Sequence, residues 1–504
     1  MDTLKNYIAQ ERLVHPVEFY FNKLSRYQFY IFSLTFASEW PLFFHMLNHF
    51  VITPKVKFYC GGEELSNGSY TGDLNKCPCS EKVYWDRSVF TSTTQMKFDL
   101  YCEREWLIGA SKSMGYIGLF FGVTAFGLMA DKFGRLPTLS LTYIITGVFG
   151  CLSTIMPEIY SFCIIRIIEG FGAGGGLVVV YVYIIEYCGP KNRPTISAIC
   201  HLPLEICHCS LGLLSYLLRD WTHAMIAMSV PCIIFGFLPL LIMESPKWLV
   251  DTGKTERAAK VMMKVCKFNK LPCDDVNKTI DLYLLQQPKG IKAPSILQCL
   301  KHKQIAINTV LMAVLFFTCG FGFYGVSQFI SEMSDCPFMD ISLSGACLIP
   351  GTILSMFLIN VLKRKVFVIG NSLLAALFFV PVVFLNTSMH MLRVVFASIS
   401  NCFFSMLFVV SFLYGCEIFP TSTRNSMLGL LSMVSRVGTI LAPLIVTIRV
   451  NYIECIFPIL ALFTAVLMLY PPETKDTILP ATIEETLDIN KKKPIFKRNN
   501  KPPL

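Results

Sequence analysis

One arginine and one glutamate lie inside long apolar stretches of the sequence, where charged side chains are rare. Arg436 lies near the middle of one stretch, and Glu205 lies in another, between His201 and His208. A charged group in an apolar medium is costly unless it is paired or faces water, so both residues are candidates for function. Arg436 can bind a carboxylate or a sulfonate through two parallel hydrogen bonds, or it can form a structural ion pair with an acid on another helix. Glu205 is a candidate for that partner, for a cation contact or for a proton carrier.

Aromatic and amide side chains on another apolar stretch can supply the neutral part of a binding site. Phe323 and Tyr324 are adjacent there, and Gln328 follows one helical turn later. Aromatic faces can enclose a ring or hold an ammonium group by a cation–π contact. Each of these aromatic residues can instead face lipid or a neighbouring helix, which is their usual role in such a stretch. We therefore predict a small-molecule-binding set of Arg436, Tyr324, Phe323, Gln328 and Glu205.

The sequence shows no pattern for several other chemistries. Cys200, His201 and the run Cys207-His208-Cys209 resemble metal-ligand spacing, but such residues in an apolar helix more often pack, so we predict no metal site. No Gly-x4-Gly-Lys-Ser/Thr loop occurs, which argues against a nucleotide partner. We also find no catalytic set of His, Asp and Cys in the polar segments. We therefore expect neither an enzyme nor a protein with a cofactor.

The composition is that of a protein embedded in a lipid bilayer. Of the 504 residues, 53% are hydrophobic and 15% are charged, whereas soluble domains carry about 25% charged residues. These values exclude a water-soluble multidomain protein and a disordered one. The net charge of +10 does not indicate a nucleic acid partner, because the basic residues lie in short segments between apolar runs. The expected partner is the bilayer itself.

Helices that cross a bilayer need about 20 mostly apolar residues, and we count twelve such segments. They span residues 28–51, 107–130, 138–156, 160–183, 195–218, 221–243, 306–329, 341–362, 366–385, 391–414, 425–447 and 450–470. The sequence therefore predicts an all-α membrane protein with twelve transmembrane helices. Residues 1–27 lack the short apolar core and cleavage site of a signal peptide, so we expect the first span to be a retained signal anchor.

Basic residues predict the orientation of the chain in the membrane. They are concentrated in alternate connections, and such basic connections face the cytosol. Both termini are then cytosolic, in a multi-pass protein that we place in the plasma membrane. The expected divisions are a cytosolic N-terminus (1–27), an N-terminal six-helix half (28–243) with an extracellular loop (52–106), a cytosolic loop (244–303), a C-terminal six-helix half (304–470) and a cytosolic tail (471–504).

The extracellular loop carries residues that suit an oxidising compartment. Its four cysteines can form two disulfides in three possible pairings, and they are Cys60, Cys77, Cys79 and Cys102. The alternative is that they remain unpaired thiols on a flexible loop. The sequon that begins at Asn67 predicts a glycan on the same loop.

Charged residues recur at matched places in the two halves, which indicates an internal repeat. Glu186 and Arg193 lie seven residues apart after the fourth span, and Glu417 and Arg424 recur after the tenth span at a shift of 231. Two six-helix halves related in this way are typical of transporters that hold a small solute near the middle of the membrane.

A tight turn with charged residues precedes the third span. Asp131 and Arg135 lie on either side of Gly134, and the shift of 231 lays residues 131–135 over residues 362–366. We predict that the acids and arginines of the two repeats pair across the interface between the halves and close the cytosolic side. The alternative is that these charges only set the topology.

Together these features resemble the organic-ion transporters (organic cation, organic anion and carnitine transporters) of the major facilitator superfamily. Five stretches carry the resemblance, namely residues 127–135, 166–176, 244–249, 417–425 and 472–485. The resemblance implies a twelve-helix fold in two halves and transport of a small organic ion by alternating access. It also implies an organic anion or a carboxylate-bearing zwitterion, because the residue at the position of Arg436 is acidic in the main cation carriers. Tyr324-Gly325 matches a Tyr-Gly pair of the same family.

Departures from the family pattern leave other interpretations open. The turn before the ninth span reads Lys363-Arg364-Lys365 without the usual acid and glycine, and Leu348 stands where an acid is usual. An organic cation transporter is the first alternative, because Glu205 can neutralise Arg436. The alternative of another class is a sensor or scaffold that keeps the fold without transporting.

Overall fold

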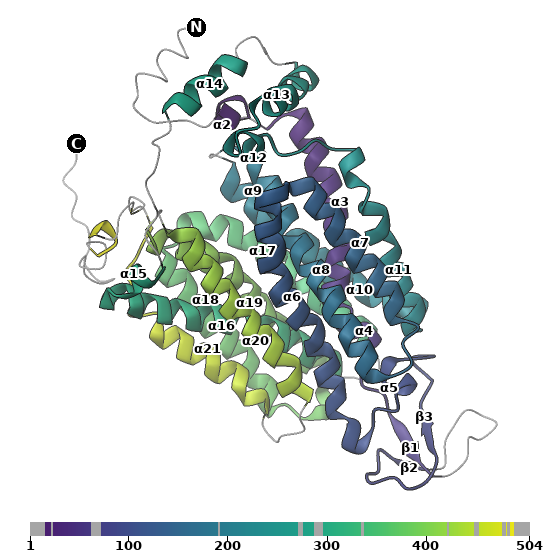
Figure 1. Cartoon of the computed structure of the whole chain (residues 1–504). Coiled ribbons are helices and arrows are strands. Elements are labelled where there is room, and N and C mark those ends of the chain that lie inside the picture. The colour runs from purple at the N-terminus through teal and green to yellow at the C-terminus, as the bar shows by residue number, and fades with distance from the viewer. Residues whose placement is uncertain are drawn as a thin grey trace. The chain divides into compact units, whose positions relative to one another are not determined.

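Long helices make up most of the computed structural model of the chain (Figure 1). The structure describes residues 16–21, 24–61, 72–189, 192–270, 276–286, 296–333, 337–420, 423–447, 453–475, 480 and 484–487.

In the N-terminal half of the sequence, the helices follow the expected spans to within a few residues, except that α11 ends eight residues before the expected end of the sixth span and is followed by the short helix η2 (Leu238–Leu240). They are α3 (Arg26–Leu47), α4 (His49–Ile52), α6 (Trp106–Phe133), α7 (Arg135–Ser153), α8 (Ile159–Glu186), α9 (Arg193–Ile199), α10 (Leu202–Leu218) and α11 (Trp221–Phe235). The short α4 prolongs α3 after Asn48, and α9 and α10 together cover the expected fifth span.

The C-terminal half follows the expected spans in the same way. Its helices are α16 (Lys303–Glu332), α17 (Pro337–Val361), α18 (Arg364–Phe384), α19 (His390–Ile418), α20 (Arg424–Thr447) and α21 (Ile456–Leu467). Within the described residues of the whole chain, ten helices are long and apolar enough to cross a membrane. Two expected spans fall outside that number, because α21 has only 12 residues and α3 is less apolar, with Glu39 and His45 in it.

The segment between α4 and α6, which we predict to be extracellular, contains a small antiparallel sheet that the all-α prediction did not include. Its strands are β1 (Phe58–Cys60), β2 (Asp73–Leu74) and β3 (Val83–Trp85), in the order β2-β1-β3. Phe58 pairs with Trp85 in the ladder, and the two rings pack edge to face at 5.7 Å, as aromatic cross-strand pairs do. The short helices α5 (Thr94–Lys97) and η1 (Cys102–Arg104) follow.

Two disulfides hold this loop. They join Cys60 to Cys79 and Cys77 to Cys102, which is one of the three pairings left open by the sequence. The predicted glycosylation site, Asn67, lies outside the described residues.

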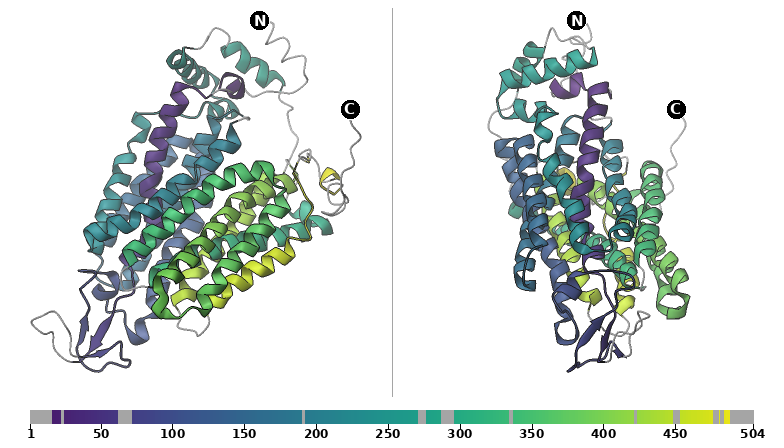
Figure 2. Two further views of the ribbon diagram at one scale, coloured as in Figure 1. Left: turned by 180° about the vertical axis from the view of Figure 1, so that it is seen from behind. Right: turned by 90° about the vertical axis from the view of Figure 1, so that its right-hand side faces the viewer.

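The connection between the two halves of the sequence is itself largely helical. It contains α12 (Pro246–Asp251), α13 (Thr255–Asn269), α14 (Val276–Gln286) and α15 (Ile296–Leu300). The helix α2 (Pro16–Tyr20) lies against α12 and α14, at one end of their compact unit (Figures 1 and 2). The buried face of α13 carries Ala258, Met262 and Val265, a spacing of three to four residues that suits a helix packed on one side.

Contacts within the chain define two compact units. The first contains Met1–His49, Met114–Cys207 and Trp221–Ile291, and the second contains Phe50–Ser113, His208–Asp220 and Lys292–Leu504. The boundaries pass through α4, α6 and α10. The first turns of α6 and the last turns of α10 therefore belong to the unit that holds the C-terminal helices.

Glycine residues allow a very close approach of α6 and α8 in the first unit. A Cβ atom at Gly118 would lie 2.0 Å from the carbonyl oxygen of Ile167, and one at Gly170 would lie 2.0 Å from that of Gly115. No side chain fits into that space, so only glycine permits this helix contact.

Candidate functional site

The second unit brings Arg436 and Tyr324 together. Arg436 lies on α20 and is half-buried, and its guanidinium interacts with the side chain of Tyr324 on α16. The backbones touch one turn earlier, where a Cβ atom at Gly320 would lie 2.1 Å from the carbonyl oxygen of Ser435. Phe323 packs edge to face on the ring of Tyr324 at 5.0 Å. The phenol of Tyr324 thus adjoins both a guanidinium and an aromatic ring.

Gln328 belongs to a different group of side chains. Its amide nitrogen donates to the carboxylate of Glu332, one turn further along α16. The same carboxylate accepts from Lys112 on α6 at 2.9 Å. We predicted that Gln328 contacts a bound molecule, whereas in this structure its amide contacts Glu332.

Glu205 is almost fully buried on α10, with 1% of its surface exposed. It lies in the first unit, whereas Arg436 lies in the second. Three residues after Glu205, His208 stacks on Phe50 with the ring centroids 5.6 Å apart, so one of the two histidines that flank Glu205 has a packing role.

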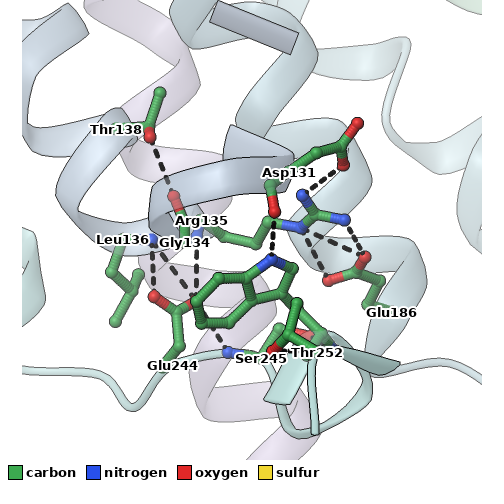
Figure 3. A network of polar contacts seen from close by, with 10 residues as sticks. Asp131, Gly134, Arg135, Leu136, Thr138, Glu186, Glu244, Ser245 and Thr252 are labelled. Atoms are coloured by element: carbon green, nitrogen blue, oxygen red, sulfur yellow. Dashed lines mark hydrogen bonds and ion pairs between the residues drawn. The ribbon is translucent and has the colours of Figure 1, made fainter. Parts of the chain in front are cut away.

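The turn between α6 and α7 is held by a network of charged groups (Figure 3). The guanidinium of Arg135 lies 2.6 Å from Glu186 and 2.6 Å from Asp131. The carboxylate of Glu186 is 11% exposed and that of Asp131 is 71% exposed. Because exposed ion pairs contribute about 0–1 kcal/mol, Glu186 is the stronger partner of Arg135.

Two residues of the segment after α11, Glu244 and Trp248, form hydrogen bonds with the two sides of this turn. Glu244 accepts the backbone N–H groups of Arg135 at 3.1 Å and Leu136 at 3.2 Å, so a carboxylate caps the start of α7 where helix N–H groups lack partners. Burial raises the pKa of Glu244, against the effect of these hydrogen bonds. The indole of Trp248 donates to the carbonyl oxygen of Asp131 at 2.8 Å, near the end of α6.

The C-terminal half repeats this network with different residues. Arg364 lies 3.0 Å from Glu417, and its backbone N–H donates to Glu473 at 2.8 Å. Lys475 replaces the indole, since its ammonium group donates to the carbonyl oxygen of Asn360 at 2.7 Å. Thr474 adds a hydroxyl that donates to Glu417 at 2.5 Å.

These contacts correct two predictions about the charged repeat. Glu417 pairs with Arg364, which was not among the predicted arginines, and the guanidinium of Arg424 donates to the carbonyl oxygen of Phe419 at 3.4 Å. Glu186 likewise pairs with Arg135 inside the N-terminal half, while Arg193 begins α9. The two ion pairs of Glu186 and Glu417 that the described residues show therefore each join helices of one half of the sequence.

The register of the repeat explains the error. Arg135 corresponds to Arg364 and Glu244 to Glu473, both at a shift of 229, whereas the shift of 231 laid Arg135 over Val366. The segment from Arg364 to Glu417 is two residues longer than the segment from Arg135 to Glu186. A single shift taken from Glu186 and Glu417 could not reveal this difference.

A further charged cluster in the first unit was missed by the sequence reasoning. Glu169 on α8 lies 2.8 Å from Arg166, 2.6 Å from His45 on α3 and 3.0 Å from the amide nitrogen of Asn48. All four residues are at most 4% exposed. Opposite charges three residues apart on an apolar helix, as in Arg166 and Glu169, were the available signal.

The chain is similar in sequence to a family of known proteins. A family model described as the Major Facilitator Superfamily matches residues 105–443. The Organic cation transporter protein of Drosophila melanogaster is 29% identical over 85% of this chain and 80% of its own length. Solute carrier family 22 member 7 of Rattus norvegicus is 26% identical over 84% and 80%. Solute carrier family 22 member 16 of Xenopus laevis is 28% identical over 86% and 78%.

A solved structure shares the fold. The xylose transporter XylE from E. coli, in an inward open conformation, matches with a TM-score of 0.66 over 91% of this chain and all of that chain, at 17% identity. An identity this low shows the fold alone. The predicted all-α fold with twelve transmembrane helices in two six-helix halves is thereby confirmed.

Proposed function

Because the chain belongs to the major facilitator superfamily, in the branch of solute carrier family 22, we propose that it carries small organic ions across the membrane by alternating access. It is a multi-pass membrane transporter and not an enzyme. The basic connections on one side support cytosolic termini, and we propose the plasma membrane as its location.

The pairing of Arg436 with Tyr324 carries the proposal for the substrate. A guanidinium repels a simple cation by about 4 kcal/mol at 4 Å if the effective dielectric constant is 20. The same group attracts a carboxylate and can give it two parallel hydrogen bonds. The adjacent rings of Tyr324 and Phe323 can hold an ammonium group or a hydrocarbon ring. We therefore favour an organic anion or a zwitterion that carries a carboxylate.

An organic cation remains the second candidate. The relative from Drosophila melanogaster is named an organic cation transporter, and a buried acid such as Glu205 favours positive charge in its surroundings. The sensor or scaffold interpretation rested on the turn at residues 363–365, which lacks the usual acid and glycine. That observation no longer favours it. Arg364 in that turn makes the same contacts as Arg135, to Glu417 and to Glu473.

Uptake by cells that express the full chain tests the charge of the substrate. The probes are p-aminohippurate as an organic anion, carnitine as a zwitterion and tetraethylammonium as a cation. We expect Arg436→Asp to abolish uptake of the first two at matched surface abundance. Arg436→Lys is the matched control, since it keeps the charge but loses the two-pronged geometry and should retain part of the uptake. Preference of the wild type for tetraethylammonium, unchanged in Arg436→Asp, would reverse the assignment.

A further inference from the structure

A buried ion pair ties the start of α6 to the end of α16. Nζ of Lys112 lies 2.9 Å from Oε1 of Glu332, and the two side chains are 1% and 13% exposed. Gln328 donates to the same carboxylate oxygen. Both residues of the pair lie in the second unit, although α6 belongs to the N-terminal half of the sequence and α16 to the C-terminal half.

The same turns of α6 also pack on α20. The hydroxyl of Ser113 donates to the carbonyl oxygen of Ile440 at 2.8 Å. A Cβ atom at Gly109 would lie 3.1 Å from the carbonyl oxygen of Pro443, so the two backbones are close at that point. The ion pair is therefore part of a larger contact of α6 with α16 and α20, two helices of the C-terminal half.

The last turns of α10 make an equivalent contact with α17. A Cβ atom at Gly345 would lie 2.2 Å from the backbone nitrogen of Cys209, and one at Gly212 would lie 2.2 Å from the carbonyl oxygen of Phe338. These turns lead directly to the extracellular side, where the N–H of Thr91 in the outer loop donates to the carbonyl oxygen of Arg219 at 3.0 Å. Two segments of the N-terminal half thus pack on C-terminal helices at the end that carries the outer loop.

We propose that Lys112 and Glu332 form an outer latch, an ion pair that holds the extracellular side closed and separates each time the transporter opens outward. This proposal rests on the proposed function, because alternating access requires the two halves to part on the outer side. An ion pair suits such a contact. Its attraction is strong while water is excluded, and water that enters on opening hydrates both ions, so that neither charge remains alone in an apolar medium.

Burial of Lys112 is what makes its pairing with Glu332 necessary. An ammonium group that is almost fully buried persists only with a compensating carboxylate, and Glu332 supplies it. Lys55, whose charge also acts on Glu332, lies nearer the surface and pairs with Glu105 at 3.2 Å. The more exposed pair contributes little by itself.

A labelling experiment tests the latch without any substrate. Half-buried Cys209 lies at the contact of α10 with α17 and should become accessible when those helices part. Intact cells that express the full chain are treated with a membrane-impermeant maleimide, and labelled peptides are quantified by mass spectrometry. Cys163 on α8 is also half-buried but lies outside this contact, so it is the matched control.

The double variant Lys112→Gln with Glu332→Gln removes both charges and leaves no buried ion, so we expect it to fold. Without the latch, the population open to the outside should grow and labelling of Cys209 should rise by about threefold or more, with no change at Cys163. The exchanged variant Lys112→Glu with Glu332→Lys restores an ion pair and should return labelling to the wild-type level. A variant that fails to reach the surface is measured in nanodiscs instead.

Unchanged labelling of Cys209 in the neutral double variant would overturn the latch. An equal rise at Cys163 would also overturn it, because that result indicates general loosening of the protein. If labelling responds as expected while none of the three organic ions is taken up, the latch stands and the proposed function fails.

Discussion

At the scale of single residues, charges inside the membrane-crossing helices are accommodated by partners on the same helix and on neighbouring segments. Glu169 illustrates this best, because Arg166 on the same helix offsets its charge while His45 and Asn48 make further hydrogen bonds with its Oε1 atom. A carboxylate with this many hydrogen bonds tolerates complete burial. Arg436 differs, since its partner Tyr324 is an uncharged phenol. Because the described residues show no ion pair of Arg436 with an acid, Arg436 is the better candidate for binding an anion.

Replacement of Glu169 by Gln should sharply reduce the stability of the protein. The change leaves Arg166 buried without its carboxylate, which costs about 3–5 kcal/mol in comparable pairs. We expect a lower unfolding temperature in detergent and less protein at the cell surface. The double variant Arg166→Gln with Glu169→Gln should recover part of the loss, because no unpaired charge remains. A double variant that is no more stable than Glu169→Gln would show that the charges do not stabilise each other.

At the scale of helices, each half uses one arginine and two acids to join three neighbouring segments. Arg135 connects α7 to Glu186 at the end of α8, and Glu244 caps the start of α7 from the segment after α11. Arg364 and Glu473 make the equivalent contacts at the start of α18. These networks fix the positions of helix ends on the side that we assign to the cytosol. We infer that they keep each bundle rigid while the halves move.

Arg364→Gln should impair transport much more than Arg424→Gln. Arg364 makes a partly buried ion pair with Glu417, whereas Arg424 contributes one long hydrogen bond of 3.4 Å to a carbonyl oxygen. Loss of the partner of a partly buried acid is the costlier change. Initial uptake of whichever probe the wild type prefers, corrected for surface abundance, measures the effect. Equal uptake by both variants would mean that the network has only a topological role.

At the scale of the whole molecule, the orientation in the membrane determines which side each network serves. The basic connections indicate that α13 lies in the cytosol and that the disulfide-linked sheet lies outside. Lys270, directly after α13, is exposed to solvent. The latch at Lys112 and Glu332 would then act on the outer side, and the Arg135 and Arg364 networks on the inner side.

An epitope tag inserted after Lys270 should react with antibody only after the cells are permeabilised. Asn67→Gln provides the complementary test, because loss of an extracellular glycan should lower the apparent mass on a gel. Both results follow from the same distribution of basic residues. Antibody binding to the tag on intact cells would reverse the orientation and exchange the roles of the two sets of charged contacts.

The sequence by itself determined the membrane fold, since the number and length of apolar runs leave few alternatives for a chain that must satisfy its backbone hydrogen bonds within the bilayer. The sequence also indicated Arg436 as a candidate binding residue, because a charged residue in an apolar run can be recognised without knowing the direction of its side chain. The cysteines of the outer loop were equally visible, but their pairing was not, since three pairings fit the same spacing.

Only the tertiary structure decided which charged groups meet. Arg364 lies in a turn without the usual acid and glycine, and it pairs with Glu417 because α18 packs on α19. The shift of 231 did not indicate this pair, because the chain from Arg364 to Glu417 is two residues longer than the chain from Arg135 to Glu186. Lys112 and Glu332 are 220 residues apart, and nothing local to either residue indicates the other. Ion pairs depend on distances of a few ångströms, whereas a periodic pattern places a residue only on a helix and on one of its faces. Partners are therefore selected by how helices pack, which is a property of the folded chain.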